Sequence, residues 1–205
     1  MLQIDDKTYW INDFNRYRTQ IPKTQIIIGF SLRKDSNHII RLQHKEFGKT
    51  KSWNTFTVCR NGLIYQHYDP KYHTDFIGVK EVDKKSISIV LENMGCLYKT
   101  PDNKYINWIN EICDNDSVVE KNWYGCNYWE QIPEIQFLNT AKLCVDLCNK
   151  YNIPKKCIEF QLYHKDTIKY NGIVFIGNYI DSSSNTNPLF DNDNFNKLIN
   201  EYENE

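Results

Sequence analysis

The chain has 205 residues, a length that suits a single domain with one substantial hydrophobic core. It carries 25 basic and 26 acidic residues, so the formal net charge is −1, and no segment gathers enough basic residues to follow a phosphate backbone. With 40% hydrophobic and 14% aromatic residues, the composition excludes an intrinsically disordered chain. We expect one folded domain over residues 1–205 and no nucleic-acid polymer as partner.

The N-terminal segment and the cysteines bear on location. Asp5 and Asp6 stand where a secretion signal needs basic and apolar residues, and no segment approaches the 18 apolar residues of a membrane span. We therefore expect a cytoplasmic protein that does not insert into membranes; its oligomeric state is left open. Seven cysteines, an odd number without a CxxC pair, predict reduced and mostly buried thiols rather than a disulfide framework or a zinc knuckle. They are Cys59, Cys96, Cys113, Cys126, Cys144, Cys148 and Cys157.

The first half of the chain contains three clear patterns. The β-branched run Gln25–Phe30 predicts a strand buried on both faces. Residues Asn37–Phe47, followed by Gly48, have the spacing of an amphipathic helix with a glycine stop. Thr55–Cys59 and Leu63–Tyr68 flank an Asn-Gly pair, which predicts a β-hairpin.

The second half adds two strands and a long helix. Ser86–Glu92 and Gly172–Ile176 are short apolar runs typical of strands, and residues 135–151 have helical spacing that ends before Pro154. A small apolar stripe, Phe195, Leu198 and Ile199, follows near the C-terminal end. This order predicts an α/β fold with a central mixed β-sheet flanked by helices, and no internal repeat or low-complexity linker.

Five motifs in this order resemble one family: QIIIGFS, LQHKEFGK, NTFTVCRNGLIYQHYD, DPKYHTDFIG and SISIVLENMG. They are similar to segments of the zinc-dependent N-acetylmuramoyl-L-alanine amidases of the phage and peptidoglycan-recognition type. The resemblance leaves out residues 96–133, which form an aromatic-rich insertion. It implies the amidase fold, a phage-type protein in the cytoplasm of an infected host cell, and zinc-dependent hydrolysis of the muramoyl-L-alanine amide.

The positions of the family's zinc ligands carry other residues here. The resemblance places the first ligand at Gly29, the second near Gln161 and the third at Lys169, and none of these side chains is a zinc donor. His164, with Asp166, is a candidate for the second position if the alignment has a local gap, but nothing nearby replaces the first ligand. The sequence therefore favours no metal and no cofactor, with zinc kept as the alternative.

Two titratable residues match positions in the family's cleft. His73 corresponds to a loop histidine and Glu92 to the acidic end of the central strand, so we predict them as catalytic acid–base groups. The alternatives are a surface histidine and a carboxylate bonded to a neighbouring loop. His67 and His44 are expected to be packing or solvent-facing residues.

Further residues are predicted to bind a ligand. Asn54 stands where the family has a catalytic tyrosine, with Thr55 in place of the histidine that follows it. His164, Lys165 and Lys169 are predicted to line one rim of the cleft. Trp123 and Trp129 of the insertion are predicted to stack on a sugar or a base, the alternative being that the insertion's aromatic residues close a small second core.

Three functions are compatible with these patterns. The favoured hypothesis is a zinc-less amidase derivative whose cleft binds a small polar ligand, such as a nucleotide-type host signal, or cleaves it by metal-free acid–base chemistry. The second is an active peptidoglycan amidase, that is, an endolysin. The third is a protein that binds peptidoglycan fragments without cutting them. Whether the chain is an enzyme is left open, because fold alone does not fix function.

Overall fold

The computed structural model describes residues 2–11, 13–34, 51–159, 161–180 and 186–202. The helix predicted over Asn37–Phe47 lies outside these ranges, as does His44. The other predicted strands and helices lie inside them.

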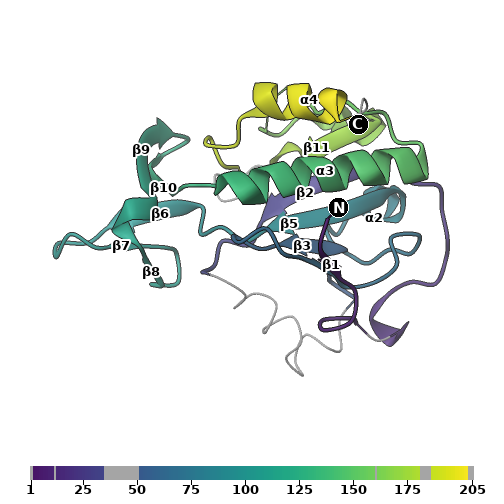
Figure 1. Ribbon diagram of the computed structural model, residues 1–205, viewed down its shortest axis with the longest axis horizontal. Coiled ribbons are helices and arrows are strands. Elements are labelled where there is room, and N and C mark those ends of the chain that lie inside the picture. The colour runs from purple at the N-terminus through teal and green to yellow at the C-terminus, as the bar shows by residue number, and fades with distance from the viewer. Residues whose placement is uncertain (1, 12, 35–50, 160, 181–185, 203–205) are drawn as a thin grey trace.

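A six-stranded mixed sheet forms the centre of the molecule (Figure 1). Its strand order is β1-β4-β3-β5-β2-β11, and all neighbours run parallel except the antiparallel pair β3–β4. Every residue of β2 and β5 is buried, as expected for parallel strands that are covered on both faces. The strands are β1 (Ile4–Asp5), β2 (Gln25–Phe30), β3 (Phe56–Val58), β4 (Ile64–Gln66), β5 (Ser86–Leu91) and β11 (Gly172–Phe175). The predicted mixed sheet and its hairpin are thus confirmed.

Two helices lie side by side over one face of this sheet (Figure 1). α3 (Glu134–Tyr151) buries a stripe that includes Ala141, Cys144 and Cys148 against the strands. It ends at Asn152, whose left-handed backbone lets the N–H of the next residue, Ile153, reach the Cys148 carbonyl at 3.0 Å. α4 (Asn192–Glu201) buries Phe195 and Ile199 in the same core, and the short α2 (Lys80–Lys85) leads into β5. The described ranges also contain four 3-10 turns: η1 (Asp13–Asn15), η2 (Asn115–Ser117), η3 (Lys165–Lys169) and η4 (Ile176–Asn178).

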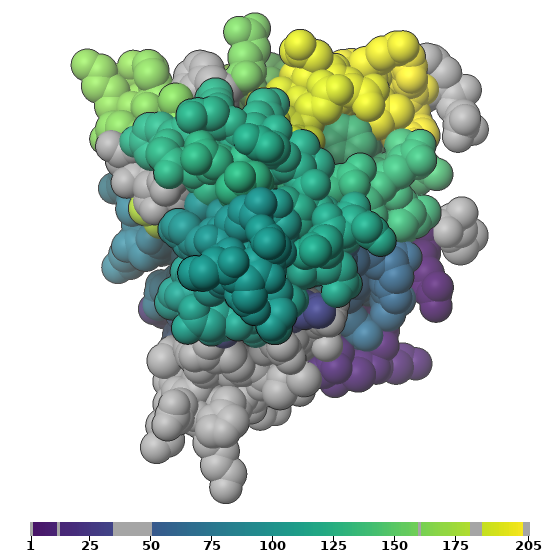
Figure 2. All heavy atoms as spheres, turned by 90° about the vertical axis from the view of Figure 1, so that its left-hand side faces the viewer, coloured from purple at the N-terminus to yellow at the C-terminus, as the bar shows by residue number. Residues whose placement is uncertain are grey.

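The aromatic-rich insertion folds into a second, antiparallel sheet beyond the carboxyl ends of β2 and β5 (Figure 1). Its order is β8-β7-β6-β10-β9, and Figure 2 shows it standing at the centre of its face of the molecule. It has a small core of its own, made by Met94, Leu97 and Cys113 with Tyr105 and Tyr128 packed against them. The strands are β6 (Cys96–Lys99), β7 (Tyr105–Ile106), β8 (Ile112–Cys113), β9 (Val118–Trp123) and β10 (Cys126–Glu130).

A disulfide in the insertion corrects one prediction. Cys96 and Cys126 are bonded, with their Cα atoms 6.0 Å apart, whereas all cysteines were expected to be reduced. The pairing of β6 with β10 brings together two residues that are 30 positions apart, so the spacing along the chain gave no sign of it. The other cysteines are free and buried, as predicted. Disulfides persist in oxidising compartments, so this bond does not favour a cytoplasmic location.

None of the helices in the described ranges combines the length and the apolar character that a bilayer crossing requires.

Candidate functional site

The carboxyl ends of β2 and β5 lie next to each other and face the insertion (Figure 1). β2 runs into the segment Ser31–Lys34, and β5 runs through Glu92 into β6. The insertion holds the first of these segments, because Asn107 Nδ2 and Trp108 Nε1 both donate to the Leu32 carbonyl. The insertion thus borders the edge of the sheet where the resemblance places a zinc site.

The first expected ligand position, Gly29, is next to apolar side chains. A Cβ atom added at Gly29 would lie 3.5 Å from Ile176 Cγ2 and 3.6 Å from Phe76 Cζ. Its neighbour across the β2–β5 pairing is Val90, which is also buried. The space next to this position therefore offers van der Waals contact and no metal donor.

The second position, Gln161, belongs to a buried amide network. Asn187 N donates to Gln161 Oε1 at 3.0 Å, and Gln161 Nε2 donates to the Asn187 carbonyl at 3.1 Å. Asn187 Nδ2 donates in turn to Asn93 Oδ1 at 3.0 Å, and Asn93 Nδ2 reaches the Glu130 carbonyl of β10 at 3.2 Å. Gln161 is 8% exposed, and both asparagines are fully buried. This network links the loop that carries Gln161 to the insertion and uses both ends of the Gln161 amide.

The third position lies on the surface. The side chain of Lys169 is 81% exposed and pairs with Asp166 at 3.4 Å within η3. His164 begins the same turn, where its Nδ1 accepts from Asp166 N, and Lys165 is exposed beside it. The predicted rim residues therefore lie together on one exposed turn.

Asn54 belongs to a buried polar cluster that includes Thr57 of β3 and His67. Its Nδ2 donates to the Phe56 carbonyl and to Thr57 Oγ1. Thr57 Oγ1 bonds His67 Nε2 at 2.9 Å, and His67 Nδ1 bonds the Tyr9 carbonyl at 2.9 Å. Burial lowers the pKa of His67 to about 4, so the ring is neutral at pH 7. His67 is a packing residue, as expected, and the Asn54 amide is engaged within the protein.

His73 and Glu92 are both buried, but they lie near opposite ends of β5. The segment of His73 lies at the amino end, because Lys23 Nζ donates to both the Tyr72 and the Lys84 carbonyls at 2.8 Å. Glu92 follows the carboxyl end, and six residues at about 3.3 Å each separate these ends by roughly 20 Å. Burial, with the charge of Lys23, lowers the pKa of His73. The structure does not bring the two predicted acid–base groups together.

The two predicted tryptophans serve different contacts. Trp129 is 0% exposed, and its Nε1 donates to the Lys121 carbonyl at 2.9 Å, so it has no ring face open to a ligand in this structure. Trp123 is half-buried, and its Nε1 donates to Thr186 Oγ1, next to Asn187. Lys121 Nζ also donates to the Pro188 carbonyl. β9 is thereby joined to residues 186–188, the segment to which Gln161 is hydrogen-bonded.

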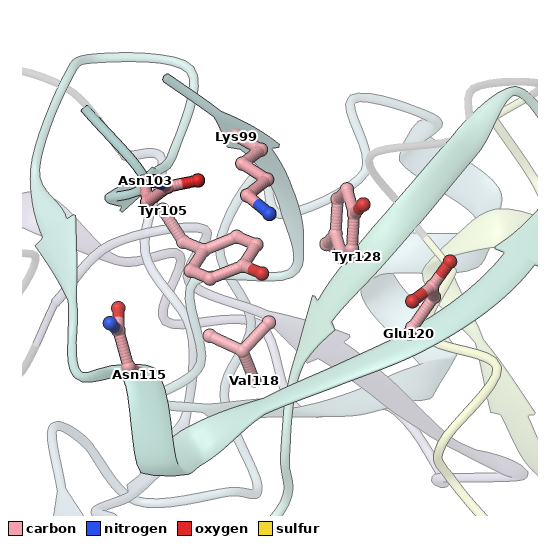
Figure 3. Close-up of a pocket in the computed structure, with 7 residues that line it drawn as sticks. All are labelled: Lys99, Asn103, Tyr105, Asn115, Val118, Glu120 and Tyr128. Carbon is pink, nitrogen blue, oxygen red and sulfur yellow. The ribbon is translucent and has the colours of Figure 1, made fainter. Parts of the chain in front are cut away.

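An open hollow of about 440 Å³ lies on one face of the insertion sheet (Figure 3). The rings of Tyr105 and Tyr128 meet there edge to face, with centroids 5.0 Å apart. From the sequence, both tyrosines belong to the aromatic residues of the insertion, but their contact with each other was not predicted. Their charged neighbours Lys99 and Glu120 were not predicted as site residues. Only the strand register, which sets Lys99 opposite Tyr105 and Glu120 opposite Tyr128, reveals the site. Its lining residues are Lys99, Asn103, Tyr105, Asn115, Val118, Glu120 and Tyr128.

The residues at the expected metal positions do not fit a zinc centre. Zinc in proteins is held by imidazole, thiolate or carboxylate donors. Gly29, Gln161 and Lys169 provide none of these, and the contacts of Gln161 and Lys169 are made within the protein. Among the residues that the structure describes, no group of three or more His, Cys, Asp or Glu side chains is arranged to hold a metal ion.

Solved amidase structures share this fold over nearly the whole chain. The N-acetylmuramoyl-L-alanine amidase LysC from Clostridium intestinale URNW is 12% identical with a TM-score of 0.56, over 98% of this chain and 97% of that chain. A mutant endolysin from Bacillus subtilis is 15% identical with a TM-score of 0.56, over 97% and 99%. The catalytic domain of XlyA is 16% identical with a TM-score of 0.55, over 97% and 99%. These similarities confirm the predicted amidase fold.

Sequence comparison identifies the family. A search among curated proteins finds no match. The sequence profile of the N-acetylmuramoyl-L-alanine amidase family matches residues 20–171, more than half of the chain, and the chain therefore belongs to this family.

Proposed function

We propose that this chain is a zinc-less member of the amidase family that binds peptidoglycan fragments without hydrolysing them through a metal. Zinc, where a protein binds it, polarises the amide carbonyl and generates hydroxide at neutral pH. The observation that carries the proposal is the Gln161–Asn187–Asn93 network, which occupies the expected second ligand position with amide groups that bond one another. The apolar contacts next to Gly29 support the same conclusion.

Binding is favoured over metal-free cleavage because the acid–base groups are separated. An acid–base mechanism needs two groups within hydrogen-bond reach of one substrate bond, or one water away from it. With His73 and Glu92 near opposite ends of β5, a small ligand does not reach both. The family membership supports a muropeptide as the ligand, and the phage-type origin remains part of this proposal.

The test combines metal content, cleavage and binding. The purified protein is incubated with zinc, freed of excess metal and analysed by mass spectrometry, and muramyl dipeptide is then offered as substrate and as ligand. We expect substoichiometric zinc, no release of N-acetylmuramic acid, and a rise in melting temperature with muramyl dipeptide. LysC provides the positive control for cleavage. Stoichiometric zinc with cleavage that a chelator abolishes would overturn the zinc-less assignment.

Binding to another ligand is a separate outcome of the same experiment. A melting temperature that rises with a cyclic nucleotide or ADP-ribose, and not with muramyl dipeptide, would overturn the peptidoglycan assignment while leaving the metal result intact.

A further inference from the structure

We infer that the hollow on the insertion sheet binds a neutral saccharide, that is, one or two pyranose rings presented by a glycan. The hollow lies on β6, β7, β9 and β10, apart from the positions Gly29, Gln161 and Lys169. The inference therefore stands independently of the proposed function.

Two tyrosines provide the apolar surface of this site. Tyr105 and Tyr128 are half-buried, and their inner edges pack on the small core of Met94, Leu97 and Cys113. The rings meet at 62°, so their exposed parts form two sides of the hollow. A pyranose ring has an apolar face of C–H groups that packs on an aromatic ring, and the phenol hydroxyl remains available for hydrogen bonding.

The charged and amide side chains around the tyrosines suit hydroxyl groups. Lys99 lies opposite Tyr105, with its Nζ 5.8 Å from the ring centroid, and Glu120 lies opposite Tyr128. Figure 3 shows the Lys99 ammonium directed toward the space between the two rings. A sugar hydroxyl both donates and accepts, so it accepts from a lysine, donates to a glutamate and does either with an asparagine. Asn103 and Asn115 supply those amides.

The balance of charges favours a neutral ligand over an anion. The lining contains one cation, Lys99, and one anion, Glu120, so a phosphate attracted by the first is repelled by the second. Within the described part of the chain, neither side chain forms an ion pair or a hydrogen bond with another residue. Both are exposed and available to a ligand. The volume, about 440 Å³, lies in the range of small-molecule sites.

The experiment titrates the ¹⁵N-labelled protein with two neutral trisaccharides, triacetylchitotriose and cellotriose, and follows backbone amide shifts. The first carries acetamido groups like the peptidoglycan glycan, and the second carries hydroxyl groups alone. We expect saturable shifts for at least one of them, confined to β6, β7, β9 and β10. Tyr128→Leu is expected to weaken binding about tenfold, which corresponds to about 1.4 kcal/mol of binding free energy. Glu120→Gln and Lys99→Met are expected to weaken it severalfold.

Matched variants keep this test independent of folding. Lys99 and Glu120 are exposed, so their substitution leaves the core unchanged. Tyr98→Leu is the control, because Tyr98 is 56% exposed and points to the opposite face of β6 from Lys99. The inference is overturned if neither trisaccharide binds at millimolar concentration, if the shifts map elsewhere, or if the Lys99, Glu120 and Tyr128 variants bind like the Tyr98 control. A protein that binds muramyl dipeptide but neither trisaccharide would overturn it and leave the proposed function standing.

Discussion

Replacing Gln161 by alanine tests whether the buried amide network is structural. The substitution removes the acceptor of Asn187 N and the donor to the Asn187 carbonyl, and Asn187 is fully buried. Each buried group left without a partner costs about 1–3 kcal/mol, so the free energy of unfolding should fall by about 2–6 kcal/mol. If Gln161 and Asn187 were part of a metal site, bound zinc would raise the free energy of unfolding. Because they bond each other instead, added zinc should leave the free energy of unfolding of the wild-type protein unchanged.

Urea denaturation, followed by circular dichroism, measures this effect. Gln131→Ala is the matched control, because Gln131 is an exposed glutamine near the same network and its change should stay within about 0.5 kcal/mol. Gln161→Glu keeps the acceptor for Asn187 N, but an ionised carboxylate would be buried against the Asn187 carbonyl oxygen, so at neutral pH it should destabilise the protein at least as much as Gln161→Ala. If Gln161→Ala is as stable as Gln131→Ala, or if zinc stabilises the wild-type protein, the reasoning fails.

Three further predictions concern the stability of the two sheets. Cys96→Ser/Cys126→Ser opens a loop of 30 residues and should lower the free energy of unfolding by about 3–4 kcal/mol. Hydrogen exchange should then become faster in β6 and β10 than in β2 and β5. Equal exchange rates in the wild-type protein and the double variant would contradict this. Arg60→Met removes the cation paired with the buried Glu130 carboxylate and should lower the free energy of unfolding by about 3 kcal/mol. Arg60→Met/Glu130→Gln should lower it less, and a double-mutant cycle in urea would measure the difference. Because burial lowers the pKa of His67 from 6.5 to about 4, the unfolded chain binds the proton first, so stability is retained above pH 6.5 and about 3 kcal/mol is lost as the pH falls to 4. His67→Gln should flatten this profile in pH-dependent denaturation, and an unchanged slope would exclude His67 as its source.

The central sheet was predictable because its signals are local. The hairpin is fixed by Asn61 and Gly62: the Asn61 side chain accepts from Leu63 N at 3.0 Å, and Gly62 takes a positive φ of 84° that glycine adopts without strain. β2 and β5 are continuous apolar runs, which identify strands buried on both faces. The helical spacing of α3 shows equally clearly which of its faces is buried.

The insertion and the site depend on contacts that are distant along the chain. β7 and β8 have two residues each, too few to show an alternating pattern. The Gln161 network joins residues 26 and 94 positions apart, and its asparagines look like ordinary loop residues in the sequence. The sequence therefore predicted that zinc donors are missing at the expected positions, but it did not predict the contacts that Gln161 makes there.

The contacts made at the expected ligand positions decide how the proposed zinc-less state could be reversed. A histidine at position 161 would meet the backbone of Asn187 where the glutamine amide now bonds it, and a histidine at position 29 would have its Cβ in contact with Ile176 and Phe76. A metal site also needs a third donor, and Lys169 points away from the protein. Gln161→His alone should therefore bind no zinc and should lose stability much as Gln161→Ala does, as metal analysis and urea denaturation of that variant would measure. Tight zinc binding by this single variant would mean that the site is still preformed, and that the amide network is a small local change rather than a rebuilt core.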